Sequence, residues 1–172
     1  MALLQISEPG KSTMPHEHRR VVGIDLGTTN SLVASVISGS PAILIQDDKS
    51  NLLPSVVYYS KNTVQVGNEA RDHQSNDAEN TISSVKRLIG KTIDDVNQVN
   101  FPLNLSDGDG VINIKTSNGM KNPIEVSAEI LKMLRTVAEN NLGGELMGAV
   151  VTVPAYFDDA PVSYTHLRAH ET

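Results

Sequence analysis

A strand that ends in a carboxylate and turns back through a glycine limits the folds open to this chain. Val21 to Ile24 is a short β-branched run typical of a buried strand. A polar turn, Asp25 to Asn30, separates this run from a second apolar segment, Ser31 to Val36. Two strands joined by a short turn that contains glycine predict a β-hairpin, with Asp25 at the end of its first strand.

Short apolar runs predict further strands along the chain. They lie at residues 42–45, 55–59, 64–66 and 111–115. An almost continuous apolar run, residues 148–153, is typical of a strand buried on both faces. The polar segment 94–122, rich in Asn, Gly and Asp, is expected to form a surface region that carries loops.

Helical spacing of apolar residues occurs in two places. Residues 81–89 are predicted to form a helix that ends at Gly90. Residues 127–142 predict a longer helix, with Ser127 as its N-cap and Gly143 at its end. Because strands and helices alternate, we expect an α/β or α+β fold.

The turn after Asp25 has the chemistry of a phosphate site. Successive backbone N–H groups of a glycine turn form a concavity that binds anions, and the hydroxyls of Thr28 and Thr29 can donate to phosphate oxygens. The Asp25 carboxylate would act through Mg²⁺ and its waters, because Mg²⁺ usually keeps several waters. An ordinary hairpin turn is the alternative, since Asp, Gly and Asn are common in turns.

Composition excludes several classes of function. The chain has 172 residues, with 14 Lys and Arg against 20 Asp and Glu, so the basic surface of a nucleic-acid binder is missing. It contains no cysteine, which excludes disulfides, thiolate zinc sites and thiol catalysis. No segment approaches the ~18 apolar residues that span a bilayer. We expect a cytoplasmic protein without nucleic-acid or membrane partners, with residues 1–20 as a flexible leader.

The segment 23–31, Gly-Ile-Asp-Leu-Gly-Thr-Thr-Asn-Ser, resembles the first phosphate motif of the DnaK-type heat-shock chaperones. These chaperones are members of the actin and sugar-kinase ATPase superfamily. Further blocks resemble the family's later segments in the same order, at residues 53–57, 85–90, 126–131 and 151–160. Residues 1–10 and 80–87 are similar to the HscA-type branch, which serves iron–sulfur cluster assembly.

The resemblance implies a nucleotide site with ATP and Mg²⁺ as cofactors. Four residues of the turn would line the β- and γ-phosphates: Gly27, Thr28, Thr29 and Asn30. Asp25 would hold water around Mg²⁺, so that Asp25 and Thr28 would take part in catalysis.

Two residues outside the turn complete the implied site. Lys86 would reach the γ-phosphate and the attacking water, and Pro154 would be the switch that relays the nucleotide state outward. The residues alone favour a solvated surface lysine, because Lys86 is expected on the polar side of a helix beside Arg87.

The implied architecture is α/β: the first lobe of the actin-like (ribonuclease-H-like) ATPase fold, a mixed sheet with flanking helices. Its inner part would comprise about 21–53 and 126–160, and its outer insertion about 54–125.

The implied function is ATP hydrolysis by a chaperone in iron–sulfur cluster assembly and protein folding, with a J-domain co-chaperone and a cluster scaffold protein as partners. A general DnaK-type chaperone and a small-molecule kinase are the alternatives. Because the family's second phosphate loop and adenosine-binding segments would lie downstream, we expect the chain alone to be inactive.

After Ala160 the resemblance ends. Pro161 and Val162 follow where the family opens a helix with a glutamine and an arginine. We interpret residues 161–172 as a frameshift, junction or assembly artefact. A metal-binding tail is the alternative, because His166 and His170 are spaced i, i+4.

Overall fold

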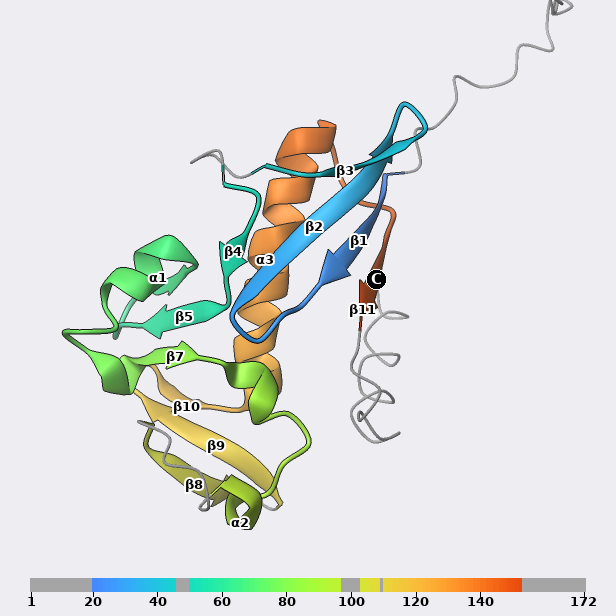
Figure 1. Ribbon diagram of the computed structural model, residues 1–172. Helices are drawn as coiled ribbons and strands as arrows, with labels where there is room; N and C mark the ends of the chain where they lie inside the picture. Colours follow the sequence, from blue (N-terminus) through green and yellow to red (C-terminus); the bar gives the residue numbers. More distant parts are fainter. Residues whose placement is uncertain (1–19, 46–49, 97–102, 109, 153–172) are drawn as a thin grey trace, which may run out of the picture.

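The computed structural model describes residues 20–45, 50–96, 103–108 and 110–152. The first of three sheets in this part of the chain has the strand order β11-β1-β2-β3, with β4 paired to β2 (Figure 1). Its strands are β1 (Val21–Asp25), β2 (Asn30–Ile37), β3 (Ser40–Ile43), β4 (Leu53–Pro54) and β11 (Gly148–Thr152). β1 runs parallel to β11 and antiparallel to β2, so the sheet is mixed and the predicted hairpin is confirmed.

Two smaller antiparallel sheets come from the middle of the chain. One has the order β6-β5-β7 and contains β5 (Val56–Tyr59), β6 (Val64–Val66) and β7 (Thr81–Ser83). The other has the order β10-β9-β8 and contains β8 (Leu105–Gly108), β9 (Val111–Thr116) and β10 (Gly119–Lys121). Short helical segments join these strands: α1 (Asn68–Asp72), η1 (Ala78–Asn80), η2 (Val85–Arg87) and α2 (Ile93–Val96).

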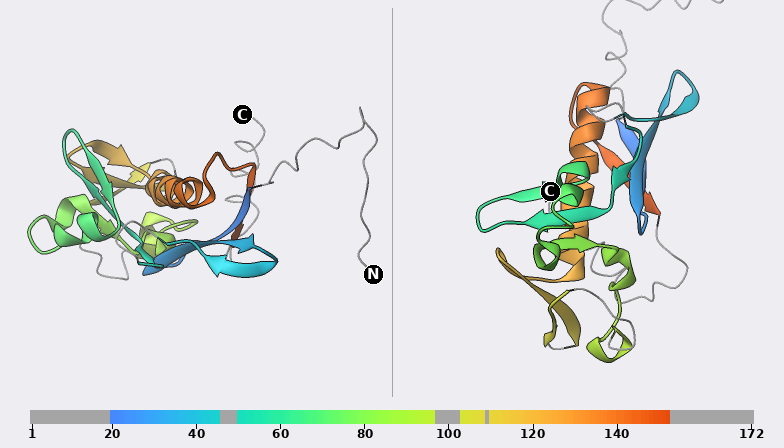
Figure 2. Two further views of the ribbon diagram at one scale, coloured as in Figure 1. Left: turned by 90° about the horizontal axis from the view of Figure 1, so that it is seen from above. Right: turned by 60° about the vertical axis from the view of Figure 1, so that its left-hand side comes forward.

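The long helix α3 (Pro123–Leu142) packs between these sheets. Figure 2 shows it end-on, with the first sheet on one side and the smaller sheets on the other. Its buried side chains recur every three or four residues and therefore share one face: Val126, Ile130, Leu134, Val137 and Ala138. Among the described residues, no helix combines the length and apolar character needed to cross a membrane.

Local interactions define both ends of α3. The side chain of Asn122 accepts a hydrogen bond from the backbone N–H of Glu125, whose carboxylate accepts one from the Asn122 backbone in return. This capping box satisfies two N–H groups that the helix itself cannot pair. Gly143 ends the helix with a φ of 68°, in the left-handed region that favours glycine.

The C-terminal end of α3 is fastened to the first sheet. Arg20, directly before β1, donates to the Leu142 carbonyl at 3.2 Å. Glu139 accepts from Arg135 at 2.8 Å and from the backbone N–H of Leu146 at 3.2 Å. These hydrogen bonds, that of Arg135 foremost, hold the pKa of Glu139 below its ordinary value. They position the segment that leads from α3 into β11.

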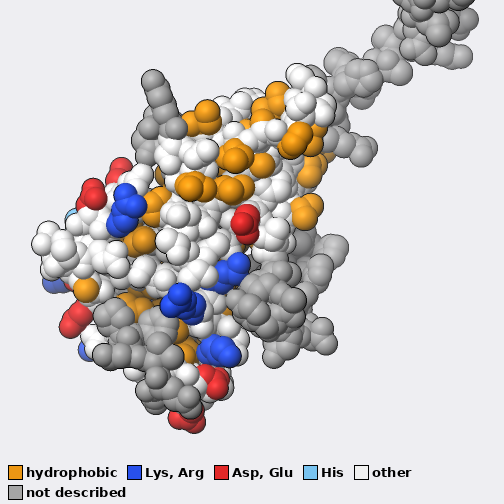
Figure 3. All heavy atoms as spheres, in the orientation of Figure 1, with side chains coloured by type: hydrophobic (Ala, Val, Ile, Leu, Met, Phe, Trp, Pro, Cys, Tyr) orange, Lys and Arg blue, Asp and Glu red, His pale blue; other side chains and the backbone are white. Residues whose placement is uncertain are grey.

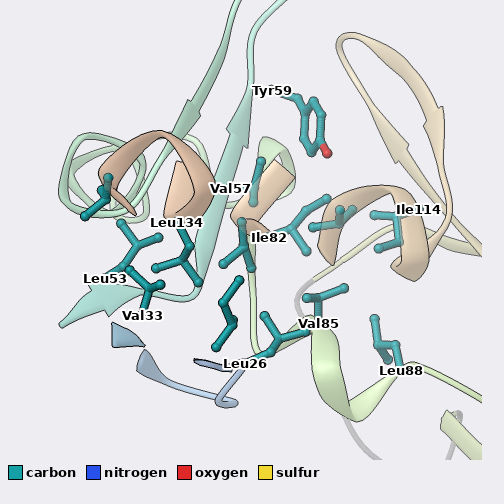
Figure 4. Close-up of a cluster of buried hydrophobic side chains, with 14 of the residues drawn as sticks. Leu26, Val33, Leu53, Val57, Tyr59, Ile82, Val85, Leu88, Ile114 and Leu134 are labelled. Atoms are coloured by element: carbon teal, nitrogen blue, oxygen red, sulfur yellow. The ribbon is translucent and has the colours of Figure 1, made fainter. Parts of the chain in front are cut away.

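One core runs through the described part of the chain (Figure 4). It joins Val33 of β2 and Leu53 of β4 to Val57, Ile82 and Leu134. Leu26, in the hairpin turn, and Val85 of η2 both belong to this cluster (Figure 4). The turn is thereby packed against a segment from the middle of the chain.

The face of the first sheet that points away from α3 carries exposed apolar side chains, which Figure 3 shows gathered over β2 and β3. Val36 is 69% exposed and Val150 of β11 is 68% exposed. β11 confirms the predicted strand, apart from Val153, which lies outside the described residues. The expectation that it is buried on both faces is wrong within this part of the chain, because β11 lies at the sheet edge and four of its five residues are exposed.

The predicted helix over residues 81–89 is wrong. Residues 81–83 form β7, where Ile82 lies opposite Val57 in an antiparallel pair, and residues 85–87 form the 3-10 turn η2. Ser84 between them has a φ of 57°, in the left-handed region. A short apolar run does not distinguish helix from strand by spacing alone, and pairing with β5 decides the outcome here.

Two further expectations need correction. The long helix begins at Pro123 rather than Ser127, and Asn122 is its cap; Ser127 lies inside the helix and donates to the Pro123 carbonyl. Within the described residues of the segment 94–122, the one strand that we expected, at 111–115, is joined by β8 and β10 in an antiparallel sheet. The expected strands over 64–66 and 111–115 are confirmed.

We expect Asn122→Ala to lower the free energy of unfolding by about 1 kcal/mol, because it removes the cap of α3. Asn122→Asp keeps a capping oxygen and should cost much less. Urea denaturation followed by circular dichroism measures both. Equal stability of the Asn122→Ala variant and the unmodified chain would contradict the role given to the cap.

Candidate phosphate-binding hairpin

The hairpin between β1 and β2 brings Asp25 to the carboxyl end of two parallel strands. In the register of β1 and β11, Asp25 lies opposite Thr152. The Thr152 hydroxyl donates to an oxygen of the Asp25 carboxylate at 2.7 Å. Ligands of α/β sheets bind at the carboxyl ends of parallel strands, so Asp25 occupies the edge at which a site is expected.

Gly27 is required by the shape of the turn. A Cβ atom at this position would lie 2.0 Å from the backbone oxygen of Asn30, a distance that no side chain tolerates. The turn therefore folds more tightly than another residue would allow. Thr28 is half-buried, and Thr29 and Asn30 are exposed, so these three residues form the surface of the turn.

Two buried serines lie beneath the turn, and sequence reasoning gave neither of them a role in the site. Ser31 of β2 and Ser55, between β4 and β5, are each 1% exposed, and their hydroxyl oxygens are 2.8 Å apart. The Gly27 N–H donates to the Ser31 hydroxyl at 3.2 Å. The strand alternation that buries Val33 also places Ser31 on the buried face, and this was the available signal.

Lys86 lies against the same turn. Its ammonium group donates to the Leu26 carbonyl, across 60 positions in the sequence. Leu26 and Val85, the residue before Lys86, are buried in the same core cluster (Figure 4). Lys86 is half-buried, whereas the neighbouring Arg87 is exposed. The geometry thus favours a lysine that belongs to the site over one that is merely solvated.

The structure brings together most of the residues expected at the site. Asp25, the turn 27–30 and Lys86 surround one end of the hairpin. Pro154 lies outside the described residues.

The donor set fits magnesium held through water. Asp25 provides an exposed carboxylate, and no group of three or more His, Cys, Asp or Glu side chains in the described ranges could hold a metal ion. A cation bound by protein side chains alone would need more such side chains around it. Mg²⁺ is commonly bound by one or two carboxylates together with waters and substrate phosphates.

The fold is that of the first lobe of an actin-like ATPase. It has a mixed sheet with flanking helices, and a glycine turn follows the carboxylate at the end of β1. The chain belongs to the Hsp70 family: the family model described as "Hsp70 protein" matches residues 21–165. The fold class and family expected from the sequence are both confirmed.

The chain is similar to curated relatives named "Chaperone protein HscA homolog". It is 56% identical to those of Methylobacillus flagellatus and Janthinobacterium sp. and 55% identical to that of Vibrio campbellii. Each match covers 93% of this chain and 26% of the relative, so the chain spans about a quarter of the length of these relatives. The expected similarity to the HscA-type branch is confirmed.

We expect Gly27→Ala to lower the free energy of unfolding by about 1–3 kcal/mol, because the added Cβ overlaps the Asn30 backbone oxygen. Gly23→Ala is the matched control: a Cβ there meets nothing within 4 Å. The control should change stability by less than about 0.5 kcal/mol. Urea denaturation of both variants tests this, and equal costs would show that the turn has room for a side chain.

Proposed function

We propose that the chain is the first lobe of the ATPase domain of an Hsp70-family chaperone that binds Mg-ATP at the hairpin and hydrolyses it. The observation that carries this proposal is the contact between Lys86 and the Leu26 carbonyl. It puts a cation beside a turn that follows a carboxylate, at the edge of the sheet where ligands bind. The Hsp70 family model supports nucleotide binding in general.

The residues divide the work of phosphoryl transfer, in which positioning and charge stabilisation supply most of the catalysis. Backbone N–H groups of the turn and the Thr28 hydroxyl donate to the phosphates. Asp25 would hold Mg²⁺ through its waters, and the ion would supply charge neutralisation. Lys86 stabilises the negative charge on the transferred group and orients the attacking water.

Two parts of the lobe serve this site. We assign residues 21–53 and 126–160 to an inner part, which carries the hairpin, and residues 54–125 to an outer part, which carries Lys86 and Ser55. The separate sheets formed by β5–β7 and β8–β10 support this division. The relatives are about four times as long, which supports a larger protein that holds the remaining adenosine contacts.

The specific role that we propose is iron–sulfur cluster assembly, with a J-domain co-chaperone and a cluster scaffold protein as partners. The support is the similarity to proteins named as HscA homologues. A general folding chaperone remains the alternative, and a small-molecule kinase is disfavoured by membership of the Hsp70 family.

In the full-length protein, Lys86→Ala should lower the single-turnover rate of ATP hydrolysis at least ~100-fold, roughly 2.7 kcal/mol. ATP affinity should change far less, because the lysine acts mainly on charge that develops in the transition state. Arg87→Ala, which removes the same charge one position away, should hydrolyse ATP at nearly the unmodified rate. A Lys86→Ala variant with the unmodified rate would refute the catalytic assignment.

We expect a cluster scaffold protein to stimulate steady-state hydrolysis by the full-length protein, and a J-domain co-chaperone to stimulate it further. An unfolded model polypeptide should stimulate less at the same concentration. Each stimulation is measured as the steady-state rate of phosphate release at saturating ATP. Stronger stimulation by the unfolded polypeptide than by the scaffold would favour the general folding chaperone instead.

A further inference from the structure

We propose that Ser31 and Ser55 are positioning residues that fix the peptide groups of the phosphate-binding turn through a closed ring of hydrogen bonds. The inference rests on the proposed function, because it assigns these serines to the same ATP site. Three contacts form the ring: Gly27 N–H to Ser31 Oγ at 3.2 Å, Ser31 Oγ to Ser55 Oγ at 2.8 Å, and Ser55 Oγ to Gly27 O at 2.9 Å.

The ring has one direction. A serine hydroxyl has a single proton to donate, and Ser55 donates its proton to the Gly27 carbonyl. Ser31 must therefore be the donor between the two hydroxyls, and it accepts from the Gly27 N–H. Each hydroxyl donates once and accepts once. Both backbone groups of Gly27 are thereby fixed by buried side chains.

The ring determines where the other polar groups of the turn point. A trans peptide group directs its N–H and its C=O to opposite sides. The Gly27 carbonyl points to Ser55, so the N–H of Thr28 points away from the buried serines. The Thr29 carbonyl accepts from the Ser55 backbone N–H at 2.8 Å, so the N–H of Asn30 also points away.

The same rule accounts for the contact with Lys86. The Leu26 carbonyl and the Gly27 N–H belong to the same peptide group. Because the Gly27 N–H points inward to Ser31, the Leu26 carbonyl points outward, and there it accepts a hydrogen bond from Lys86. The N–H of Gly27 is already engaged inside the protein. We therefore assign phosphate contacts to the N–H groups of Thr28 and Asn30 and not to that of Gly27.

Burial makes the ring effective. Both serines are 1% exposed, so water is not available to replace a lost partner. A buried polar group without a partner is costly, and the turn must then change its shape to satisfy the Gly27 groups. A preorganised donor set binds its ligand without this rearrangement.

The test compares alanine variants of buried serines in the full-length protein. Ser31→Ala and Ser55→Ala should each raise the KM for ATP about tenfold while kcat stays within about threefold, because the turn contacts are already made in the bound ground state. Ser127→Ala is the matched control: Ser127 is also buried, but it donates to the Pro123 carbonyl within α3. The control variant should keep the KM for ATP within about twofold of the unmodified value, even if the substitution lowers the stability of the protein. Urea denaturation measures the stability of all three variants.

The double variant tests the ring itself. Either single substitution already opens the ring. The variant that carries both Ser31→Ala and Ser55→Ala should therefore have a KM for ATP no more than about twofold above that of the worse single variant. If the fold-increase in KM of the double variant equals the product of the two single fold-increases, the serines act independently and the ring is overturned. Unchanged KM in both single variants, with normal hydrolysis by the unmodified protein, would overturn this inference alone. An unmodified protein that neither binds nor hydrolyses ATP would overturn the proposed function and this inference together.

Discussion

Burial of one face of α3 is the interaction on which the other elements depend. Its apolar stripe meets the first sheet through β2 and the outer segments through η2 and β5, so the helix joins parts of the chain that have separate sheets. Ile130 and Leu134 are almost fully buried in the common core. Apolar burial contributes roughly 25 cal/mol per Å². This shared surface helps to place η2, and with it Lys86, relative to the hairpin.

The fold could be predicted from the sequence wherever spacing and turn chemistry agreed. The hairpin at Asp25, the strands over 64–66 and 111–115 and most of α3 follow from local patterns. The prediction for residues 81–89 was wrong because antiparallel pairing of Ile82 with Val57 is a long-range choice that local spacing does not encode. The start of α3 was misplaced for a smaller reason: Ser127 and Asn122 are both capping residues by type, and only Asn122 has Glu125 three residues later.

The site was predictable to a different degree at each residue. Asp25 and the threonines follow from the turn motif, while the residues alone left Lys86 as an ordinary surface lysine. Its role came from the family resemblance, and the structure supplies the contact with Leu26 that local sequence does not show. Ser31 and Ser55 lie within the resembling segments 23–31 and 53–57, but the sequence alone gives neither hydroxyl a role. Their meaning depends on a hydroxyl pair formed across 24 positions.

The distances along the chain between the partners at the site determine when the site can form. Lys86 and Leu26 are 60 positions apart, and Thr152 and Asp25 are 127 apart. Contacts between distant positions carry the largest loop-closure entropy and form late in folding. During synthesis the hairpin leaves the ribosome first, yet its carboxylate gains its threonine partner only after the whole outer region and α3 have followed. The proposed site therefore gains this contact only once β11 has been made, and nascent chains that end before β11 carry the turn motif without the Thr152 partner of Asp25.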